Sequence, residues 1–279
     1  MLKKVADFFL FSSLYIALCA VLMVYQSAGL FFKNNVSPSF YLFVFLSTIC
    51  SYNFHWYLSA QTPHVSTRHN WALENKQLHL VLYILGALGA VYYAYLLRAH
   101  WLWIGIGIFV TFLYSAPKIP QKIFIGLRKI AIGKTIFLAF VWMYVTTLLP
   151  QLISGKPMST AFMLFAAGRF FFIYSICILF DYRDREDDKA NGIKSMITWF
   201  NERGITNLFT VSILVFIIST VLLLLYNYSV LQVIVLLLPG LLLVALYSVA
   251  KRNFSDYLYY FVLDGLMMLS ALLMLVLHI

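Results

Sequence analysis

Charged residues are scarce in this chain, and acidic residues are the scarcest. Asp, Glu, Lys and Arg make up 11% of its 279 residues, whereas hydrophobic residues make up 63%. A soluble globular domain carries roughly 25% charged residues. The chain therefore has too few charges to cover a water-facing surface. This excludes an ordinary soluble enzyme, a disordered protein and an ordinary nucleic-acid-binding domain.

Cysteines are also few, and a cleavable leader is not indicated. Cys19, Cys50 and Cys177 all lie in apolar stretches, and none belongs to a C-x-x-C pair. Neither a disulfide framework nor a zinc site is therefore supported. The apolar run that follows Lys3 and Lys4 is long and lacks an A-x-A cleavage site. We expect this run to be retained as the first membrane span.

Long apolar runs fill the chain instead. A membrane-spanning helix needs about 20 residues, and such a run must be helical because lipid offers the backbone no hydrogen-bond partners. The ten-residue alternation of a β-barrel is not seen. The sequence predicts an all-α integral membrane protein, with residues 1–279 forming a single transmembrane domain. The nine predicted spans are approximately 8–32, 40–60, 77–97, 100–117, 130–149, 160–181, 205–226, 229–250 and 257–278.

Basic residues fall mainly on one side of these spans. Fifteen of the 20 Lys and Arg residues lie at the N-terminus or in the loops after the second, fourth, sixth and eighth spans. The opposite side has Lys33, Arg98 and Lys156, and Lys134 and Arg169 fall inside spans. Loops rich in Lys and Arg stay in the cytoplasm. We therefore expect a cytoplasmic N-terminus, in a bacterial inner membrane.

Half of the acidic residues gather in one segment. Five of the ten stand within eight positions of FDYRDREDDKANGIKS, residues 180–195. If the helix of the sixth span continues, Asp181, Asp184 and Asp188 share one face at i, i+3 and i+7. Mg²⁺ would compensate their repulsion, and it commonly joins one or two carboxylates to substrate phosphates. The alternative is a solvated loop whose acids pair with nearby Arg and Lys residues.

The pattern around these residues resembles the UbiA superfamily of intramembrane prenyltransferases. The second aspartate-rich motif of that family reads N-D-x-x-D-x-x-x-D, then G-x-x-[ST]. It matches at Asp181, Asp184, Asp188, Gly192 and Ser195, with Phe180 in place of the leading Asn. A Tyr-Ser-x-Pro signature with a basic loop matches TFLYSAPKIPQKIFIGLRKIAIGK. Trp142 in the fifth span, and Asp264 within YLYYFVLDGLMML, are also similar to the family.

This resemblance implies both a fold and a reaction. The fold is a UbiA-like bundle of nine helices around a central cavity. The reaction transfers a prenyl group from a polyprenyl diphosphate to a small membrane-soluble acceptor of the aromatic or lipid-quinone type, with Mg²⁺ as cofactor. The implied catalytic and metal-binding residues are Asp181, Asp184 and Asp188. The implied substrate-binding residues are Asn53, Tyr57, Tyr114, Ser115, Lys118, Lys122, Arg128 and Lys134.

The first aspartate-rich motif of the family is degenerate in this chain. Asn53 matches its leading Asn, but Tyr57 and Gln61 stand where the family has aspartates, and residues 49–73 contain no acid. A hard divalent cation loses most of its affinity without anionic ligands.

Three alternatives stay open. In the first, the chain is a divergent transferase that uses one metal, with Lys118, Lys122, Arg128 or Lys134 replacing the other. In the second, it binds a polyprenyl or lipid phosphate without transfer. In the third, it performs different chemistry on a lipid. A transporter is disfavoured because the sequence shows no internal repeat.

Two charges inside the predicted spans need partners or a cavity, because a buried charge is costly in a bilayer. Asp264 is either a cavity carboxylate or a structural partner of Arg169 or Lys134. Arg169 is either an ion-pair residue or a substrate contact. Its offset of 12 residues from Asp181, about 18 Å along a helix, places it too deep for the same diphosphate. We interpret Asp256 and Glu202 as ordinary loop charges.

Overall fold

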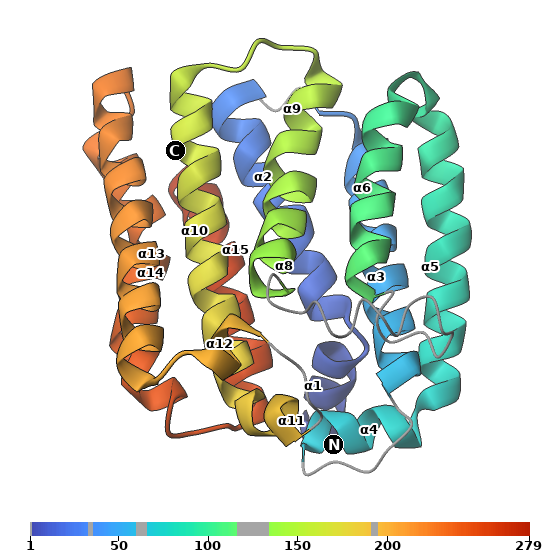
Figure 1. The fold of residues 1–279 in the computed structure, drawn as a ribbon. Helices are drawn as coiled ribbons and strands as arrows, with labels where there is room; N and C mark the ends of the chain where they lie inside the picture. Colours follow the sequence, from blue (N-terminus) through green and yellow to red (C-terminus); the bar gives the residue numbers. More distant parts are fainter. Residues whose placement is uncertain (1, 33–35, 60–65, 116–133, 191–194) are drawn as a thin grey trace.

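The computed structural model describes residues 2–32, 36–59, 66–115, 134–190 and 195–279. Every regular element within these ranges is a helix, which confirms the predicted all-α class. The main helices are α1 (Leu2–Phe11), α2 (Leu14–Phe32), α3 (Pro38–Ser59), α4 (Thr67–Glu74), α5 (Lys76–Leu96), α6 (Trp101–Ser115), α8 (Lys134–Met143), α9 (Leu149–Ser154), α10 (Thr160–Arg183), α11 (Arg185–Ala190), α12 (Met196–Trp199), α13 (Glu202–Val221), α14 (Val230–Ala250) and α15 (Asp264–Leu277) (Figure 1). Short 3₁₀- or π-helical segments are η1 (Arg98–His100), η4 (Tyr144–Leu148), η5 (Leu222–Tyr226) and η6 (Leu258–Leu263).

Seven helices in the described ranges are long and apolar enough to cross a membrane. They run over Leu14–Phe32, Lys76–Leu96, Thr135–Ser154, Thr160–Arg183, Glu202–Tyr226, Val230–Ala250 and Leu258–Leu277. Of the nine predicted spans, the two missing from this set correspond to α3 and α6. α3 is diluted by Ser, Thr, Asn and His residues, and α6 is described over only 15 residues. The chain is therefore a multi-pass integral membrane protein, and a count of nine spans is not confirmed.

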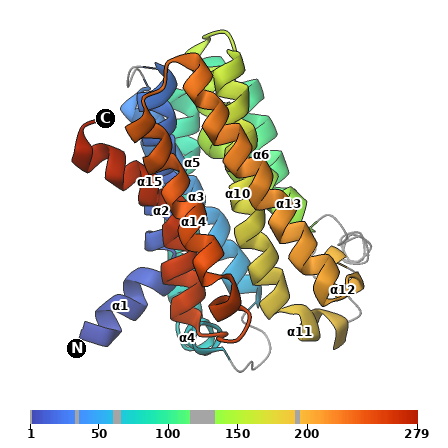
Figure 2. The same ribbon diagram turned by 90° about the vertical axis from the view of Figure 1, so that its left-hand side faces the viewer.

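The first predicted span, 8–32, is wrong as a single helix. α1 ends at Phe11 and α2 begins at Leu14, with Ser13 between them at a φ of 71°. This left-handed conformation cannot continue a right-handed helix. α1 consequently leaves the bundle at an angle (Figure 2).

Eight helices contact one another in succession around the interior. The order is α2, α3, α6, α8, α10, α13, α14 and α15, and α15 returns to α2. α5 packs outside this ring against α3. Gly86 permits that approach, because a Cβ there would lie 2.8 Å from the Cys50 backbone nitrogen. Small residues allow such close contact between membrane helices.

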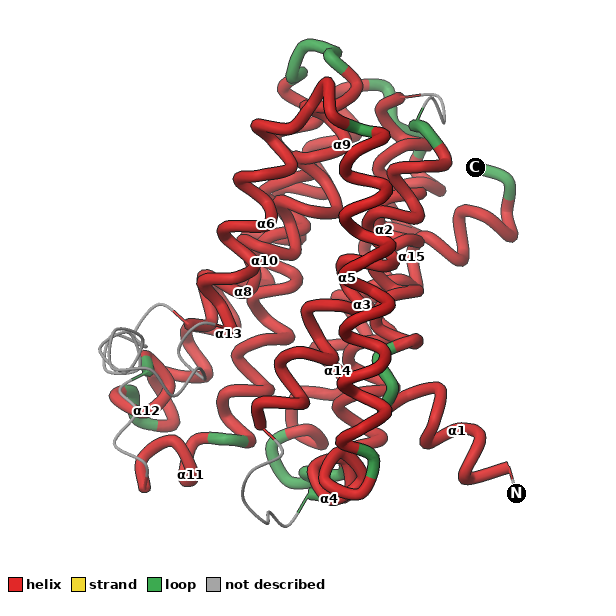
Figure 3. Tube along the Cα trace, turned by 90° about the vertical axis from the view of Figure 1, so that its right-hand side faces the viewer, coloured by secondary structure: helices red, strands yellow, loops and turns green. Residues whose placement is uncertain are grey.

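The short helices gather at one end of the ring, which we call the site end. α1, α4 and α11 all lie there (Figures 1 and 3). α9 lies at the opposite end (Figure 1). The site end is also where α3 finishes and where α10 delivers the acidic segment. The fold therefore brings the two motif regions of the sequence to the same end of the bundle.

Candidate functional site

α10 carries the first aspartate of the acidic segment to the site end. Ser159 caps the start of the helix, because its hydroxyl accepts the Phe162 N–H at 3.1 Å, and the helix runs over 24 residues from Thr160 to Arg183. Asp181 is buried in its last turn and accepts a hydrogen bond from the Thr135 hydroxyl of α8. α8 therefore fixes the direction of this carboxylate.

The helix does not continue through the whole motif. Asp184 ends α10 with φ and ψ of −85° and 2°, and α11 starts at the next residue. The unbroken helix that would place Asp181, Asp184 and Asp188 on one face is therefore not present. Asp188 is nevertheless buried, with 8% exposed, whereas the Asp184 side chain is 42% exposed. The burial of Asp181 and Asp188 disagrees with a fully solvated loop.

Arg183 connects Asp184 to the last membrane span. Its Nε donates to Asp184 Oδ1 at 2.8 Å, and its Nη2 donates to the Tyr260 hydroxyl at 3.0 Å. Its guanidinium also lies 4.7 Å from the centre of the Tyr259 ring. Asp184 thus pairs with a neighbouring arginine, as the loop alternative predicts.

Two glutamates nearby are ordinary surface charges. Glu186 accepts a hydrogen bond from Lys189 at 2.8 Å, and this bond lowers the pKa of the Glu186 carboxyl. The Glu202 carboxylate contacts Arg185 and Lys251, each at 2.7 Å. The interpretation of Glu202 as a loop charge agrees with these exposed pairs.

Asp256 is buried, so its interpretation as an ordinary loop charge was wrong. Its carboxylate accepts the Ser66 hydroxyl at 3.0 Å and the Arg68 backbone N–H at 2.9 Å. Ser66 is the N-terminal cap of α4. Arg183 Nη1 also lies 3.8 Å from Asp256. Asp256 therefore fixes the start of α4 beside the acidic end of α10.

Arg68 is a candidate that the sequence analysis missed. It is 2% exposed, and its guanidinium lies 4.0 Å from the centre of the Tyr260 ring and 4.4 Å from that of Trp56. In the described part of the chain, its Nε and Nη2 have no hydrogen-bond partner. Burial lowers the pKa of this guanidinium. Arg68 counted only as one basic loop residue in the sequence, where nothing signalled its burial.

Asp264 faces the same group of charges. It is buried at the start of α15, and the cations that act on it are Arg68 and Arg183. Arg169 instead bonds to neutral oxygens of Ser27, Thr146 and other residues. The structure thus contradicts the alternative in which Asp264 pairs with Arg169, and it places Asp264 at the site end.

The end of α3 offers a different kind of surface. Asn53 is fully buried; its Nδ2 donates to the carbonyls of Ile49 at 2.8 Å and Ser12 at 3.1 Å. Its Oδ1 lies 2.6 Å from His79 Nδ1. The predicted partner Tyr57 has Lys76 Nζ 5.0 Å from its ring centre. Both predicted substrate-binding residues of α3 therefore contact α5, and Asn53 also contacts the turn between α1 and α2.

The neighbouring face of α3 turns toward the interior. Tyr52 packs edge-on against Trp142 of α8, and Trp56 packs edge-on against Tyr260 of η6, each at 6.2 Å between ring centres. This face carries aromatic rings where a metal site needs carboxylates.

The other predicted site residues cannot be placed by their side chains. Tyr114 and Ser115 end α6, and Lys134 begins α8, but their side chains are outside the described residues. Also outside the described residues are Gln61, Lys118, Lys122, Arg128 and Gly192.

The donor chemistry fits Mg²⁺ on one side of the site only. The described residues contain no group of three His, Cys, Asp or Glu side chains that could hold a metal by themselves. Mg²⁺ needs only one or two carboxylates when phosphates complete its ligand shell. The buried carboxylates of Asp181 and Asp188 meet that need. On the α3 side, the Asn53 amide is already bonded to His79 and the Arg68 guanidinium is a cation, so neither group suits a metal ion.

Comparisons with known proteins identify a family and a similar fold. Residues 70–272 match the model of the UbiA prenyltransferase family. The fold is similar to a solved structure of a UbiA homolog from Archaeoglobus fulgidus bound to GPP and Mg2+. The TM-score is 0.62 at 14% sequence identity, over 96% of this chain and 98% of that chain. None of the curated proteins matches the chain in sequence.

Proposed function

Because the chain belongs to the UbiA prenyltransferase family, we propose that it transfers a prenyl group from a polyprenyl diphosphate to a small acceptor in the bilayer. Family members are prenyltransferases, and the acceptor we propose is aromatic or of the lipid-quinone type. The observation that carries the proposal is the burial of two motif carboxylates, Asp181 and Asp188, at the end of α10. Carboxylates brought together at one helix end suit Mg²⁺, which prefers oxygen ligands and commonly joins one or two carboxylates to substrate phosphates.

Asp181, Asp184 and Asp188 would hold the Mg²⁺ ion in this proposal. When bound, Mg²⁺ neutralises diphosphate oxygens and so makes the diphosphate a better leaving group. The Thr135 hydroxyl orients Asp181. Arg183 restrains Asp184 mainly through Oδ1, because Nη2 is 3.5 Å from Oδ2. One oxygen of Asp184 thus stays available.

Arg68 would contact the diphosphate on the α3 side of the site, where the described residues offer no carboxylate ligands for a second metal. Its Nε and Nη2 are buried donors without partners in the described residues, and a diphosphate offers several acceptor oxygens. The remaining phosphate contacts would come from Tyr114, Ser115, Lys118, Lys122, Arg128 and Lys134. Asn53 and Tyr57 stay predicted substrate contacts, although the Asn53 amide already has three partners.

The aromatic face of α3 would guide the prenyl group. The rings of Tyr52, Trp56 and Trp142 lie on the inner side of the bundle near Arg68. Aromatic faces attract positive charge, which develops on the allylic carbon as the diphosphate leaves. These rings would also exclude water that competes with the acceptor.

We propose further that the protein lies in the inner membrane of a bacterium and that the site end faces the cytoplasm. α1, α4 and α11 lie together at this end (Figure 1). Arg68, Lys76, Arg185 and Lys251 belong to or adjoin helix ends there. The concentration of basic residues supports a cytoplasmic N-terminus.

A second candidate function is binding of a polyprenyl or lipid phosphate without transfer. The observation that favours it is the α3 side of the site, where the described residues 38–59 contain no carboxylate. Loss of one metal removes transition-state charge stabilisation, whereas phosphate binding can persist through arginine and one metal.

The test is diphosphate release by the purified protein in lipid nanodiscs. Polyprenyl diphosphates of increasing chain length are supplied with and without Mg²⁺, and with a panel of aromatic and quinone-type acceptors. The proposal expects Mg²⁺-dependent release and an alkylated acceptor. Tight binding of every donor without release would favour the second candidate. Neither binding nor release would overturn both.

A further inference from the structure

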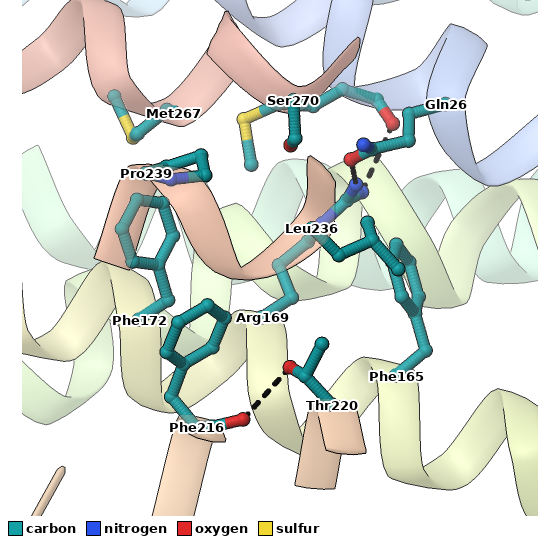
Figure 4. A pocket seen from close by; sticks show the side chains of 11 residues that line it. Gln26, Phe165, Arg169, Phe172, Phe216, Thr220, Leu236, Pro239, Met267 and Ser270 are labelled. Carbon is teal, nitrogen blue, oxygen red and sulfur yellow. Dashed lines mark hydrogen bonds between the residues drawn. The ribbon is translucent and has the colours of Figure 1, made fainter. Parts of the chain in front are cut away.

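A small cavity lies inside the bundle, away from the site end. It is lined by residues of α2, α10, α13, α14 and α15, and among the described residues that line it Arg169 of α10 is the one charged residue (Figure 4). Arg169 is 12 residues from Asp181, about 18 Å along the helix. The cavity is therefore separate from the proposed diphosphate site, and nothing in the proposed reaction uses it.

Arg169 has no anionic partner in the described part of the chain. Its Nη1 donates to the Met23 carbonyl at 3.0 Å, the Ser27 hydroxyl at 2.7 Å, the Thr146 carbonyl at 3.1 Å and the Thr147 hydroxyl at 3.1 Å. All of these acceptors are neutral. They hold the guanidinium in position and leave its full positive charge inside a membrane span, where an unneutralised charge is costly.

Several hydrogen-bond donors around this cavity lack an acceptor among the described residues. Arg169 Nη2 carries two hydrogens but has one acceptor, Gln26 Oε1 at 2.6 Å, and Nε has none among the described residues. The Ser270 hydroxyl, which faces the same cavity, makes no hydrogen bond within those residues either. Gln26 Nε2 finds only the thioether of Met274 at 3.3 Å, a weak acceptor. Such a surplus of donors beside a cation suits an anion.

The size of the cavity limits what it can hold. Its volume is about 30 Å³, and a single water needs roughly 10–15 Å³ by this measure. A prenyl chain, a diphosphate or an aromatic acceptor does not fit. The rings of Phe165, Phe172 and Phe216 form much of the remaining wall. An occupant must therefore be compact and able to lose most of its hydration.

We infer that this cavity binds one small monovalent anion of about the size of chloride, held by Arg169 and Ser270. The anion neutralises the guanidinium and accepts hydrogen bonds from the donors that lack a protein acceptor. By joining Arg169 of α10 to Ser270 of α15, it also stabilises the packing between those two helices.

The test is an anion titration of the purified protein. Thermal unfolding is followed by tryptophan fluorescence as chloride replaces gluconate at constant ionic strength. The expected result is a saturable rise in unfolding temperature of about 2–4 °C. Arg169→Gln removes the charge and should abolish the rise. Ser270→Ala should weaken the apparent chloride affinity several-fold without changing the maximal rise.

Thr220→Val is the matched control. Thr220 lines the same cavity, but its hydroxyl already donates to the Phe216 carbonyl at 2.8 Å. This variant should respond to chloride as the wild type does. If Arg169→Gln does not fold, crystals grown in bromide decide the question, with an anomalous peak expected within hydrogen-bond distance of Arg169.

A compact carboxylate such as formate offers the same chemistry. Protein that responds to formate but not to chloride would support anion binding with a small carboxylate as the ligand. Equal unfolding temperatures in chloride, gluconate and formate, together with no bromide peak, would overturn the inference and leave only water in the cavity.

Discussion

The two sides of the candidate site bury polar groups in opposite ways. On the α10–α11 side, Asp181 and Asp188 are buried carboxylates, and the Thr135 hydroxyl of α8 donates to Asp181. On the α3–α4 side, the Asn53 amide is hydrogen-bonded to His79, and the buried charge is the guanidinium of Arg68. One side therefore presents anions suited to a metal, and the other presents a cation suited to the phosphate itself.

The residues that match the family model cover the α10–α11 side of the site but not α3. The matched range, 70–272, includes the whole α10–α11 side and begins after the segment of α3 that lacks acids. A site built for two metals needs carboxylates facing each other, whereas a site with one metal and one arginine needs them on one side only. The difference between the two sides thus predicts a single metal, and the variants below test that prediction.

The largest effect should come from the α10–α11 side. Asp188→Asn removes a buried anionic ligand while keeping its size. We expect diphosphate release to fall by two or more orders of magnitude, because the metal contributes several kcal/mol to charge stabilisation. Glu186→Gln is the matched control on the same helix, since the Glu186 side chain is 80% exposed and bonds to Lys189. Equal losses in both variants would contradict the role of Asp188.

The number of metal ions bound per chain tests whether only the α10–α11 side holds a metal. With Mn²⁺ as a paramagnetic probe and a non-reactive diphosphate as ligand, the wild type should bind one ion per chain and Asp188→Asn none. Two ions in the wild type would place a metal on the α3 side and contradict the contrast drawn between the two sides.

The next largest effect should come from Arg68. Arg68→Met replaces a buried guanidinium, with two donors lacking partners, by an apolar chain of similar length. Losing charged hydrogen bonds to a ligand costs about 1.5–3 kcal/mol. The variant also removes one of the two cations that act on the buried Asp264 carboxylate, so the unfolding temperature should fall. We expect the KM for the donor to rise roughly tenfold or more as well. A lower unfolding temperature at unchanged KM would show that Arg68 only supports α4.

Asn53→Ala tests whether the α3 side is structural at this position. The change leaves His79 Nδ1 and the Ser12 carbonyl without a partner inside the bundle. Leaving buried polar groups unsatisfied costs about 1–3 kcal/mol. We expect a clear fall in unfolding temperature, while the Mg²⁺ concentration that gives half-maximal release stays unchanged. A shifted Mg²⁺ dependence at normal stability would return Asn53 to the ligand-binding set.

The sequence was a good guide where contacts are local. Apolar runs predicted α10, α13, α14 and α15 closely, because lipid forces each run into a helix. The acidic motif was equally visible, since its residues stand within one short segment. The break at Ser13 was not visible, as neither Gly nor Pro marks it. The pair of Arg68 and Asp256 was not visible either, because 188 residues separate the two partners in the chain.

The smallest effect should come from the exposed acid of α11. Hydrogen bonding to Lys189 lowers the pKa of Glu186, so the pair stabilises the fold above the ordinary carboxyl pKa, near 4.3, and loses that effect as the pH falls through the lowered value. The Glu186 side chain is largely exposed, and solvent screens such pairs strongly. Glu186→Gln should therefore lower the unfolding temperature barely, near neutral pH, and not at all once the wild-type carboxyl is protonated. Unfolding curves at several pH values check this. A large and pH-dependent loss would mean that all acids of α11 act together, and burial would then not separate Asp188 from its neighbours.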